Sequence, residues 1–320
     1  MVKSTVKING SLVVYLLCLV GSTLASGQIL DTAMAIPVGG IRQWISMKGT
    51  DRRNPVLLIL HGGPGNSVIS YSDKFTGELQ KQFVVVNWDQ RESGKTGQLN
   101  PSPQPLTVAL MTSDAVEVIK YLCKALSASK IYLMGHSWGG FLGMQVAGQH
   151  PELLTAYIPI CPMIHQAESE RLALSWMQTK ATAENNQQAK AELSGVHIPF
   201  GSGEQLYYHR KWLLHYAGAK EPTRETVESW ALKWLALFNE ASAINFLATL
   251  PRLECPVYFF VGGRDYQTST KLTTEFYSRV KAPDKQIFVF ESTAHNLPTA
   301  EPARLQRTIL ETIVPRVAQK

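Results

Sequence analysis

Short, uninterrupted apolar runs that alternate with amphipathic segments place the strongest constraint on the fold of this 320-residue chain. Five runs consist almost entirely of aliphatic and aromatic residues: 55–60, 83–88, 130–135, 256–261 and 286–290. Strands buried on both faces of a parallel sheet have this composition, because helices cover both faces. Between and after these runs, apolar side chains recur at helical spacing over residues 113–126, 268–280 and 303–314. The alternation predicts an α/β fold with a mostly parallel, doubly wound sheet.

Two regions depart from this alternation. Residues 29–49 contain a Gly-Gly turn between two extended runs, which predicts an antiparallel hairpin at the sheet edge. Residues 163–250 contain no strand pattern and instead carry amphipathic, Trp-rich stretches. We therefore expect a helical cap (lid) over 163–250, inserted between two parts of the core at 28–162 and 251–320. Most of its aromatic side chains are expected to pack between helices, and its inner face to line a pocket.

The N-terminal segment has the pattern of a secretory signal peptide. Lys3 and Lys7 precede the apolar stretch 11–25, which small residues follow, so cleavage is expected near Ala25 or Gly27. An uncleaved anchor is the alternative, but the stretch is shorter than the ~20 residues that span a membrane. We therefore expect residues 1–27 to be a signal peptide. The mature protein would be exported, periplasmic or secreted, and free of the membrane.

Composition and cysteine content exclude several classes of protein. The formal net charge is +6 without a long Lys/Arg run, so no nucleic-acid partner is expected. Cys18 lies in the predicted signal peptide, and Cys123, Cys161 and Cys255 remain. This odd number at unpatterned spacing allows one disulfide but implies no disulfide framework. No Cys-x-x-Cys pair or His/Cys cluster is present in the sequence, so we expect neither a metal nor a cofactor.

The pentapeptide Gly-His-Ser-Trp-Gly at 135–139 is the first candidate for chemistry. It ends a predicted strand and opens a predicted helix, as expected for a serine nucleophile on a sharp strand-to-helix turn. Gly135 and Gly139 would remove side chains that clash in such a turn. An ordinary Gly-Ser turn is the alternative, since the pattern occurs by chance in roughly one such chain in ten. If Ser137 is a nucleophile, it needs a histidine base, and that histidine needs a carboxylate.

Candidates for the acid and the base follow Ser137 along the chain, in the order that this arrangement requires. Asp265 comes directly after the buried run 256–261, where active-site loops of a parallel sheet emerge. Asp284 lies in the segment KAPDKQ, which we expect to be a solvated turn, so Asp265 is the better candidate. His295 shortly follows the last apolar run and is the candidate base.

A loop rich in glycine supplies candidates for the oxyanion hole. The segment LHGGPG at 60–65 comes directly after the first apolar run of the core. Backbone N–H groups in such a loop stabilise the oxyanion that forms when a serine attacks a carbonyl. We assign the N–H groups of Gly63 and Trp138 to this role, with an ordinary Gly-Pro turn as the alternative.

These motifs together resemble those of α/β-hydrolase-fold serine hydrolases of the proline iminopeptidase type. From about residue 30 onward the chain carries, in the family's order, HGGPG (61–65), WDQRESGKT (88–96), GHSWGG (135–140), GGRD (262–265) and AHNLP (294–298). The resemblance implies that the first motif is the oxyanion loop. It also implies that Asp89 and Arg91 brace the floor of the site, which we interpret as an ion pair that supports loops.

Two departures from the family pattern concern the substrate. The family usually has glycine after Asp-Gln-Arg, where this chain has Glu92. Aminopeptidases of the family hold the substrate's ammonium group with lid glutamates, one of them in a Trp-x-x-Trp-Glu run. Here Leu235 stands where that glutamate would fall, which leaves Glu204 and Glu240 as candidates for substrate binding.

The expected function is that of an exported serine hydrolase which releases an N-terminal residue, with proline as a candidate, from small peptides. An esterase or amidase acting on apolar small molecules is the alternative enzyme. A catalytically silent binding protein would require the loss of a catalytic position, and none is lost. The expected partner is therefore a small peptide or a small-molecule ester or amide, and the oligomeric state is left open.

Overall fold

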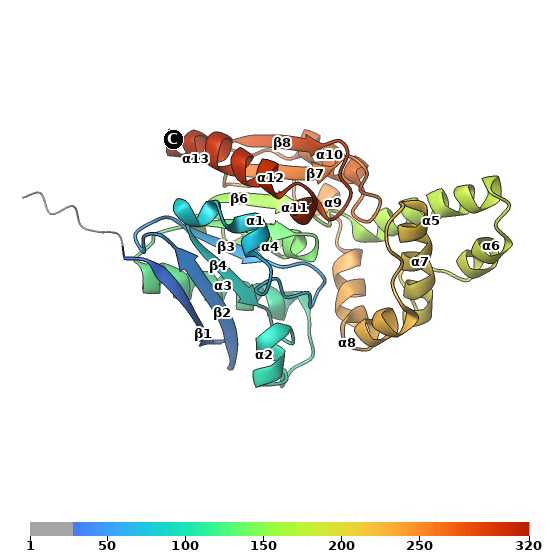
Figure 1. Ribbon diagram of the computed structural model, residues 1–320, viewed down its shortest axis with the longest axis horizontal. Coiled ribbons are helices and arrows are strands. Elements are labelled where there is room, and N and C mark those ends of the chain that lie inside the picture. Colours follow the sequence, from blue (N-terminus) through green and yellow to red (C-terminus); the bar gives the residue numbers. More distant parts are fainter. Residues whose placement is uncertain (1–27, 320) are drawn as a thin grey trace, which may run out of the picture.

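The computed structural model describes residues 28–319, so the predicted signal peptide lies outside the described residues. An eight-stranded sheet of order β1-β2-β4-β3-β5-β6-β7-β8 crosses the molecule (Figure 1). Its strands are β1 (Leu30–Val38), β2 (Ile41–Gly49), β3 (Val56–Leu60), β4 (Val84–Asp89), β5 (Ile131–His136), β6 (Leu154–Ile160), β7 (Val257–Gly262) and β8 (Lys285–Phe290). All neighbouring pairs from β4 to β8 are parallel, which confirms the predicted α/β sheet.

The two N-terminal strands form the predicted hairpin. β1 pairs antiparallel with β2, and β2 pairs antiparallel with β4. Gly39 and Gly40 form the turn with φ of +56° and +76°. Two-residue hairpin turns of this kind need positive φ at both positions, which glycine adopts without a steric penalty.

Strand β6 is missing from the sequence prediction. It lies between β5 and β7 in the middle of the sheet, and Pro159 stands opposite Gly135 of β5. A proline has no N–H to donate and argues against a central strand, so the local pattern is misleading here. Tyr157, Ile158 and Ile160 are fully buried, and their packing decides the conformation of this segment.

Helices cover both faces of the sheet. In the core they are α1 (Asp73–Thr76), α2 (Gly94–Leu99), α3 (Val108–Leu126), α4 (Trp138–Gln149), α10 (Thr270–Arg279), α11 (Leu297–Ala300), α12 (Pro302–Thr308) and α13 (Val314–Ala318). Leu58 and Leu60 of β3 pack in the cluster that contains α3 and α4. Leu57 and Ile59 pack in the opposite cluster, with α1 and α12. This burial on both faces explains the uninterrupted apolar runs.

Helix α3 begins five residues earlier than the sequence pattern predicts. Thr107 caps it, because the Thr107 side chain accepts a hydrogen bond from the N–H of Leu110 at 3.1 Å. Threonine at this position satisfies one of the N–H groups that lack a partner within the helix.

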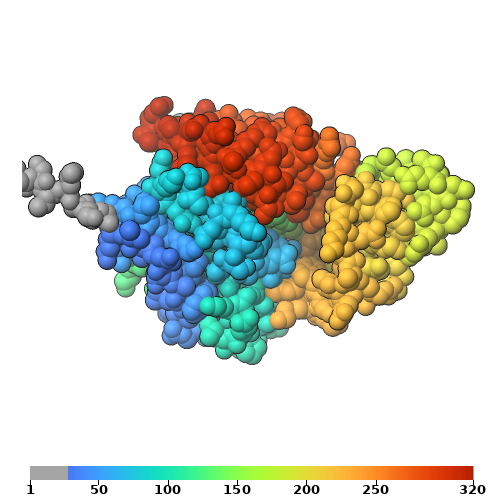
Figure 2. Space-filling view, viewed as in Figure 1, coloured from blue at the N-terminus to red at the C-terminus, as the bar shows by residue number. Residues whose placement is uncertain are grey.

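Five helices form the segment between β6 and β7: α5 (Gln166–Ala183), α6 (Gln187–Ser194), α7 (Gly203–Tyr216), α8 (Arg224–Ala243) and α9 (Phe246–Thr249). We call residues 163–250 the cap. A bridge between His165 and Asn245 joins the start and end of this segment. Figures 1 and 2 show the cap, in yellow-green to orange, projecting from one end of the core. Within residues 28–319, every helix is too short or too polar to cross a membrane.

Candidate active site

Ser137 occupies a strained turn between β5 and α4. Its backbone has φ of +56° and ψ of −117°, which residues other than glycine rarely adopt. The N–H of Ser137 donates to the carbonyl of Ile160 at 2.9 Å. A Cβ atom on Gly139 would lie 2.0 Å from the carbonyl oxygen of Leu60, so only glycine fits there. The turn therefore places the buried serine at the carboxyl end of β5, where it lines a cavity.

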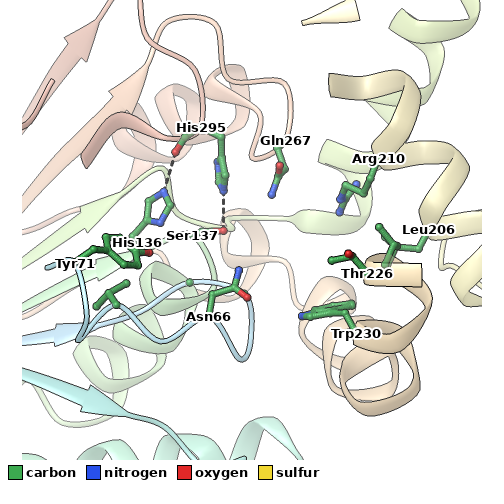
Figure 3. A pocket seen from close by; sticks show the side chains of 14 residues that line it. Asn66, Tyr71, His136, Ser137, Leu206, Arg210, Thr226, Trp230, Gln267 and His295 are labelled. Carbon is green, nitrogen blue, oxygen red and sulfur yellow. Dashed lines mark hydrogen bonds between the residues drawn. The ribbon is translucent and has the colours of Figure 1, made fainter. Parts of the chain in front are cut away.

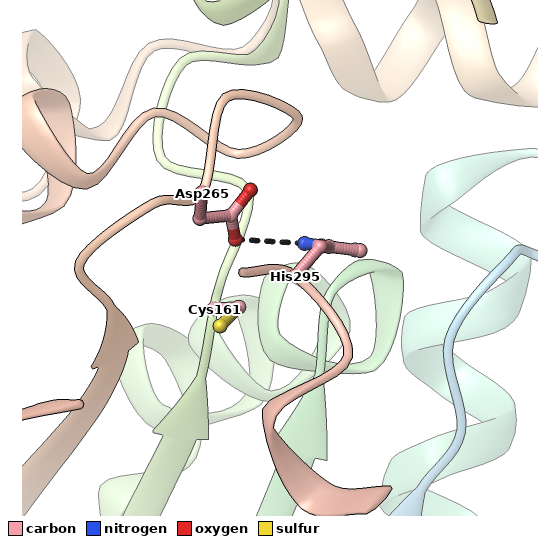
Figure 4. Close-up of side chains that lie close together, drawn as sticks. All are labelled: Cys161, Asp265 and His295. Carbon is pink, nitrogen blue, oxygen red and sulfur yellow. Dashed lines mark hydrogen bonds and ion pairs between the residues drawn. The ribbon is translucent and has the colours of Figure 1, made fainter. Parts of the chain in front are cut away.

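The side chains of Ser137, His295 and Asp265 lie in hydrogen-bonding contact (Figures 3 and 4). His295 Nε2 lies 2.9 Å from Ser137 Oγ, and His295 Nδ1 lies 2.8 Å from Asp265 Oδ2. With the proton on Nδ1, His295 donates to the Asp265 carboxylate and accepts from the Ser137 hydroxyl. We call this arrangement the Ser137–His295–Asp265 chain. The three residues follow β5, β8 and β7, so the sheet brings them together.

Asp265 is buried and fixed by several donors. Its Oδ1 accepts the N–H groups of Gln267 at 2.8 Å and Thr268 at 3.0 Å. Its Oδ2 accepts the hydroxyl of Thr268 at 2.8 Å as well as His295 Nδ1. Burial raises the pKa of Asp265, but the charge of His295 and these hydrogen bonds outweigh burial and hold the pKa below its ordinary value. The carboxylate is therefore ionised and oriented toward His295.

Cys161 lies beside the same carboxylate (Figure 4). Its thiol and the side chains of Asp265 and His295 offer ligand atoms within 4.8 Å of one another. Metals bind the thiolate form of cysteine. Burial raises the pKa of the Cys161 thiol well above its ordinary value and so disfavours that form. His295 Nδ1 and Asp265 Oδ2 already bond to each other. The sequence does not indicate this cluster, because its members lie far apart along the chain.

The cysteines that remain after the predicted signal peptide form no disulfide within residues 28–319. Cys123, Cys161 and Cys255 are all free thiols. The single disulfide that the sequence allows is therefore absent from the part of the chain that the structure describes.

Asp284 is not in a solvated turn, contrary to the sequence prediction. It is buried and accepts hydrogen bonds from the hydroxyl of Tyr258 at 2.7 Å and from two nitrogens of Arg316, both at 2.6 Å. The expectation is wrong because the C-terminal helix α13 folds back and covers the turn. Asp284 precedes β8 and His295 follows it, so the two lie toward opposite ends of that strand.

A cavity of about 350 Å³ opens over Ser137, between the core and the cap (Figure 3). The core contributes Gly62, Gly63, Asn66, Val68, Tyr71, His136, Ser137, Gln267 and His295. The cap contributes Leu206, Arg210, Thr226, Val227 and Trp230. Both apolar and polar groups therefore face the serine, and the cap supplies the wall opposite it.

The predicted oxyanion donors lie where the core loop meets this cavity. Gly63 lines the cavity, and Trp138 is the first residue of α4, so its N–H has no partner within the helix. The loop packs against α8 of the cap, because Trp230 Nε1 donates to the carbonyl of Pro64 at 2.8 Å. A Cβ atom on Gly65, whose φ is +94°, would lie 2.6 Å from the Trp234 ring.

A second, mainly apolar cavity of about 160 Å³ adjoins the first. The two share Val68, Tyr71 and His136. The remaining lining is mostly aliphatic, aromatic and proline side chains from β3, α1, β5, β6 and the segment after His295, with His61, Asn296 and Thr299 as the polar members. The site therefore has an apolar chamber on the core side.

Glu204 and Glu240, the predicted substrate-binding residues, do not line the cavity over Ser137. Glu204 is exposed and pairs with Arg224 at 3.0 Å. Glu240 accepts a hydrogen bond from the N–H of Val108 at 3.1 Å. No acidic side chain of residues 28–319 is among those lining this cavity. The sequence does not fix the direction of either side chain: α7 leaves Glu204 at the surface beside Arg224, and α8 turns Glu240 toward α3.

His136 and Arg210 line the cavity and are absent from the sequence prediction. His136 precedes the nucleophile candidate, and burial lowers its pKa to about 4, so the ring is neutral at pH 7. Its Nε2 donates to the carbonyl of His295 at 2.8 Å. The position of His136 inside the Gly-x-Ser-x-Gly motif is a usable sequence signal. Arg210 has none, because it lies among other polar residues of a helix.

Asp89 and Arg91 do not form the expected ion pair with each other. Arg91 is fully buried and pairs with Asp114, with 2.8 Å between Nε and Oδ2. Asp89 accepts the N–H of Lys95 at 2.8 Å and the hydroxyl of Ser67. Both residues hold loops, as predicted, but through different partners. The partner of Arg91 comes from α3, far along the chain, so the local motif does not reveal it.

Glu92 adopts φ of +61°, which explains why the family usually has glycine at this position. Its carboxylate accepts the N–H of Ser102 and pairs with Lys233 of α8 at 2.9 Å. In this chain the residue therefore links the core to the cap.

Residues 55–297 match the protein family described as alpha/beta hydrolase fold. This chain belongs to that family. The hydrolase is 26% identical over 302 residues to the probable aminopeptidase YbaC of Bacillus subtilis (strain 168), covering 86% of this chain and 93% of that protein. It is 25% identical over 251 residues to a proline iminopeptidase of Heyndrickxia coagulans, covering 75% of this chain and 83% of that protein.

The fold of the hydrolase is also similar to a solved structure. The crystal structure of a proline iminopeptidase from Mycobacterium smegmatis superposes with a TM-score of 0.64 at 18% identity. The match covers 90% of this chain and 99% of that structure. The resemblance to the proline iminopeptidase type is therefore supported by sequence relatives, and the fold by structure.

Proposed function

We propose that this hydrolase is a serine hydrolase in which the Ser137–His295–Asp265 chain acts as a catalytic triad. The observation that carries the proposal is the pair of contacts of 2.9 Å and 2.8 Å that joins the three side chains. As Ser137 Oγ attacks a substrate carbonyl, His295 Nε2 takes the hydroxyl proton. Asp265 keeps the other ring nitrogen protonated and stabilises the imidazolium that forms.

The tetrahedral intermediate then needs donors for its oxyanion. The N–H groups of Gly63 and Trp138 are the candidates, since they flank the nucleophile from the loop and from the start of α4. When the intermediate collapses, the bond to the leaving group breaks, and the leaving amine or alcohol takes the proton from His295. Water attacks the acyl-enzyme with His295 as base, and the acid product and free Ser137 result.

The substrate class is small acyl compounds, with small peptides first among them. A cavity of about 350 Å³ suits a small molecule, and the similarity to an aminopeptidase and a proline iminopeptidase favours release of an N-terminal residue, with proline as a candidate. An esterase or amidase activity is the second candidate. It is favoured by the lack of an acidic side chain, among the described residues that line the cavity, to bind an ammonium group.

A fluorophosphonate probe tests the proposed nucleophile. The wild type is expected to be labelled at Ser137, and Ser137→Ala is expected to lose both labelling and turnover while its circular dichroism spectrum is unchanged. Ser194→Ala, at an exposed position in the cap, is the control and is expected to label like the wild type. Labelling of Ser137→Ala at the wild-type rate would contradict the proposal.

Matched substrates then separate the two enzyme activities. Prolyl-2-naphthylamide, its N-acetyl derivative and 4-nitrophenyl acetate are compared on the wild type. An aminopeptidase is expected to prefer the free amine over the acetylated form. An esterase or amidase is expected to accept the ester and to ignore the amino group.

We also propose that residues 1–27 are a secretory signal peptide and that the mature protein is exported. The support is the charged, apolar and small-residue pattern of this segment. Expression of the full chain in a bacterial host, followed by mass spectrometry of the exported fraction, is expected to find an N-terminus near residues 26–28. Recovery of the intact N-terminus from the membrane fraction would contradict the proposal.

A further inference from the structure

Arg210 lies in the cap wall of the cavity that contains Ser137. Figure 3 shows Arg210 on the cap side, with Ser137 and His295 on the core side. The Arg210 side chain is only 14% exposed, so its guanidinium belongs to the cavity rather than to the outer surface. Among the described residues that line the cavity, Arg210 is the one that carries a full positive charge at pH 7.

The guanidinium is held in place from behind. Its two terminal nitrogens donate to the two oxygens of Glu170 at 2.7 Å and 2.6 Å, and Nη1 also donates to His209 Nδ1 at 2.9 Å. Glu170 is buried and accepts a further bond from Gln166 Nε2 at 2.7 Å. Such a bidentate pair fixes the plane of the guanidinium. Arg210 is therefore positioned before any substrate arrives.

Two N–H groups of Arg210 remain for a ligand. A guanidinium has five N–H donors, and the bonds to Glu170 and His209 use three of them. The Nε–H group and one Nη2–H group make none of the hydrogen bonds found within residues 28–319. These two donors have the parallel geometry that a carboxylate accepts.

The rest of the cavity lining is compatible with an anion beside Arg210. No carboxylate of residues 28–319 lines it, and its other polar side chains include the carboxamides of Asn66 and Gln267. The adjoining chamber beyond His136 is mainly apolar. A substrate with one apolar end and one anionic end therefore has a suitable surface for each, with Ser137 between them.

We propose that Arg210 binds a carboxylate of the substrate, so that the preferred substrates are small esters or amides that carry a free carboxylate. This inference rests on the proposed serine hydrolase activity and names its substrate class. It replaces the expected binding of an ammonium group by Glu204 or Glu240, neither of which lines the cavity.

Two pairs of uncharged and anionic esters test the inference. 4-Acetoxybenzoate and 4-acetoxybenzamide differ by a carboxylate in the leaving group. Monomethyl glutarate and the methyl ester of glutaramic acid differ by a carboxylate in the acyl group. We expect kcat/KM to favour the anionic member of at least one pair by roughly 10- to 100-fold, mainly through KM, as for a hydrogen-bonded ion pair.

The variants must not leave Glu170 buried without a partner, because an unpaired buried charge destabilises the fold. The double variant Glu170→Gln/Arg210→Gln removes both charges together, and its unfolding midpoint and phosphonate labelling report whether the site is intact. The anionic preference is expected to fall toward onefold. Arg224→Gln, which removes an exposed arginine of the cap paired with Glu204, is expected to keep the wild-type preference.

The outcomes separate the inference from the proposed function. Equal kcat/KM within both pairs for the wild type, or an unchanged preference in a folded, labelled double variant, would overturn the role of Arg210. Failure of the wild type to react with the phosphonate and with every ester would instead contradict the serine hydrolase activity. A higher kcat/KM of the wild type for the uncharged member of both pairs would also overturn the role of Arg210.

Discussion

Asp265 and Asp284 are the two aspartates that follow Ser137, and they lie toward opposite ends of the neighbouring parallel strands β7 and β8. Asp265 comes after β7 and contacts His295 at 2.8 Å. Asp284 comes before β8 and pairs with Arg316 at 2.6 Å. Both are buried carboxylates with strong partners, so burial alone does not distinguish a catalytic candidate from a structural ion pair. The position of Asp265 at the carboxyl end of its strand does distinguish the catalytic candidate.

Replacement of Asp265 tests the triad at the residue scale. Asp265→Asn is expected to fold but to lose kcat by on the order of 10⁴-fold, because the amide would stabilise the wrong tautomer of His295. Steady-state kinetics on 4-nitrophenyl acetate measures the loss, and circular dichroism checks the fold. A folded variant within tenfold of the wild-type kcat would exclude Asp265 as the partner of the base.

Replacement of Asp284 is expected to have the opposite effect. Asp284→Asn weakens the buried pair with Arg316 and should lower the free energy of unfolding by about 1–2 kcal/mol, since Arg316 is half exposed and can be solvated. Urea titration measures this change. The folded variant is expected to keep the wild-type kcat, and a large loss of kcat would place the acid at Asp284 instead.

At the scale of elements, the loop 61–65 beside Ser137 packs against helix α8 of the cap. Trp230 donates to Pro64, and Trp234 lies against Gly65. Glu92 and Lys233 add an ion pair between the same helix and the core at 2.9 Å. The oxyanion candidate Gly63 therefore lies in a loop whose position depends on the cap.

A methyl group at Gly65 is expected to disturb this contact. Gly65→Ala combines a positive φ with a Cβ atom 2.6 Å from the Trp234 ring, so it should destabilise the protein by about 2–4 kcal/mol and lower kcat. Gly218→Ala is the matched control, because Gly218 has φ of +69° and no atom within 4 Å of an added Cβ. It should cost about 1 kcal/mol and leave kcat unchanged. Equal effects on stability and kcat would show that the α8 contact is unimportant.

For the whole molecule, burial of histidines couples stability to pH. Burial lowers the pKa of His136 and His209 from 6.5 to about 4, and it also lowers the pKa of His61. Between pH 6.5 and about 4 the unfolded chain binds protons at these positions and the folded protein does not. The stabilisation that comes from burying these rings in the neutral form is therefore complete above pH 6.5. It is lost as the pH falls through this interval.

The free energy of unfolding is accordingly expected to fall on acidification from pH 7 to pH 5. Each buried histidine contributes a slope of up to about 1.4 kcal/mol per pH unit. His209→Gln should reduce the slope measured by urea titration, whereas His197→Gln, at an exposed position, should not. A slope that is the same in all three proteins would mean that His209 is not buried as a neutral ring.

The sequence by itself determined seven of the eight strands within residues 28–319, the helical character of residues 163–250 and the three residues of the Ser137–His295–Asp265 chain. These features are local. Apolar runs indicate strands buried on both faces, and a motif directly after such a run indicates a residue at the carboxyl end of the strands. The position of Ser137 between β5 and α4 follows from the run 130–135 and the glycines around it. The family could be recognised from the sequence for the same reason, because its motifs are short and contiguous.

Only the tertiary structure decided the features that depend on contacts between distant segments. Pro159 is in a central strand because β5 and β7 enclose it, and Arg91 is neutralised by Asp114 rather than by its neighbour Asp89. Glu240 turns to the N-terminus of α3, and Arg210 turns into the cavity. The side chains of a helix project in every direction around its axis. The packing of the whole cap on the core decides which of them face Ser137. That selection is a sum of long-range contacts, which no local pattern of residues records.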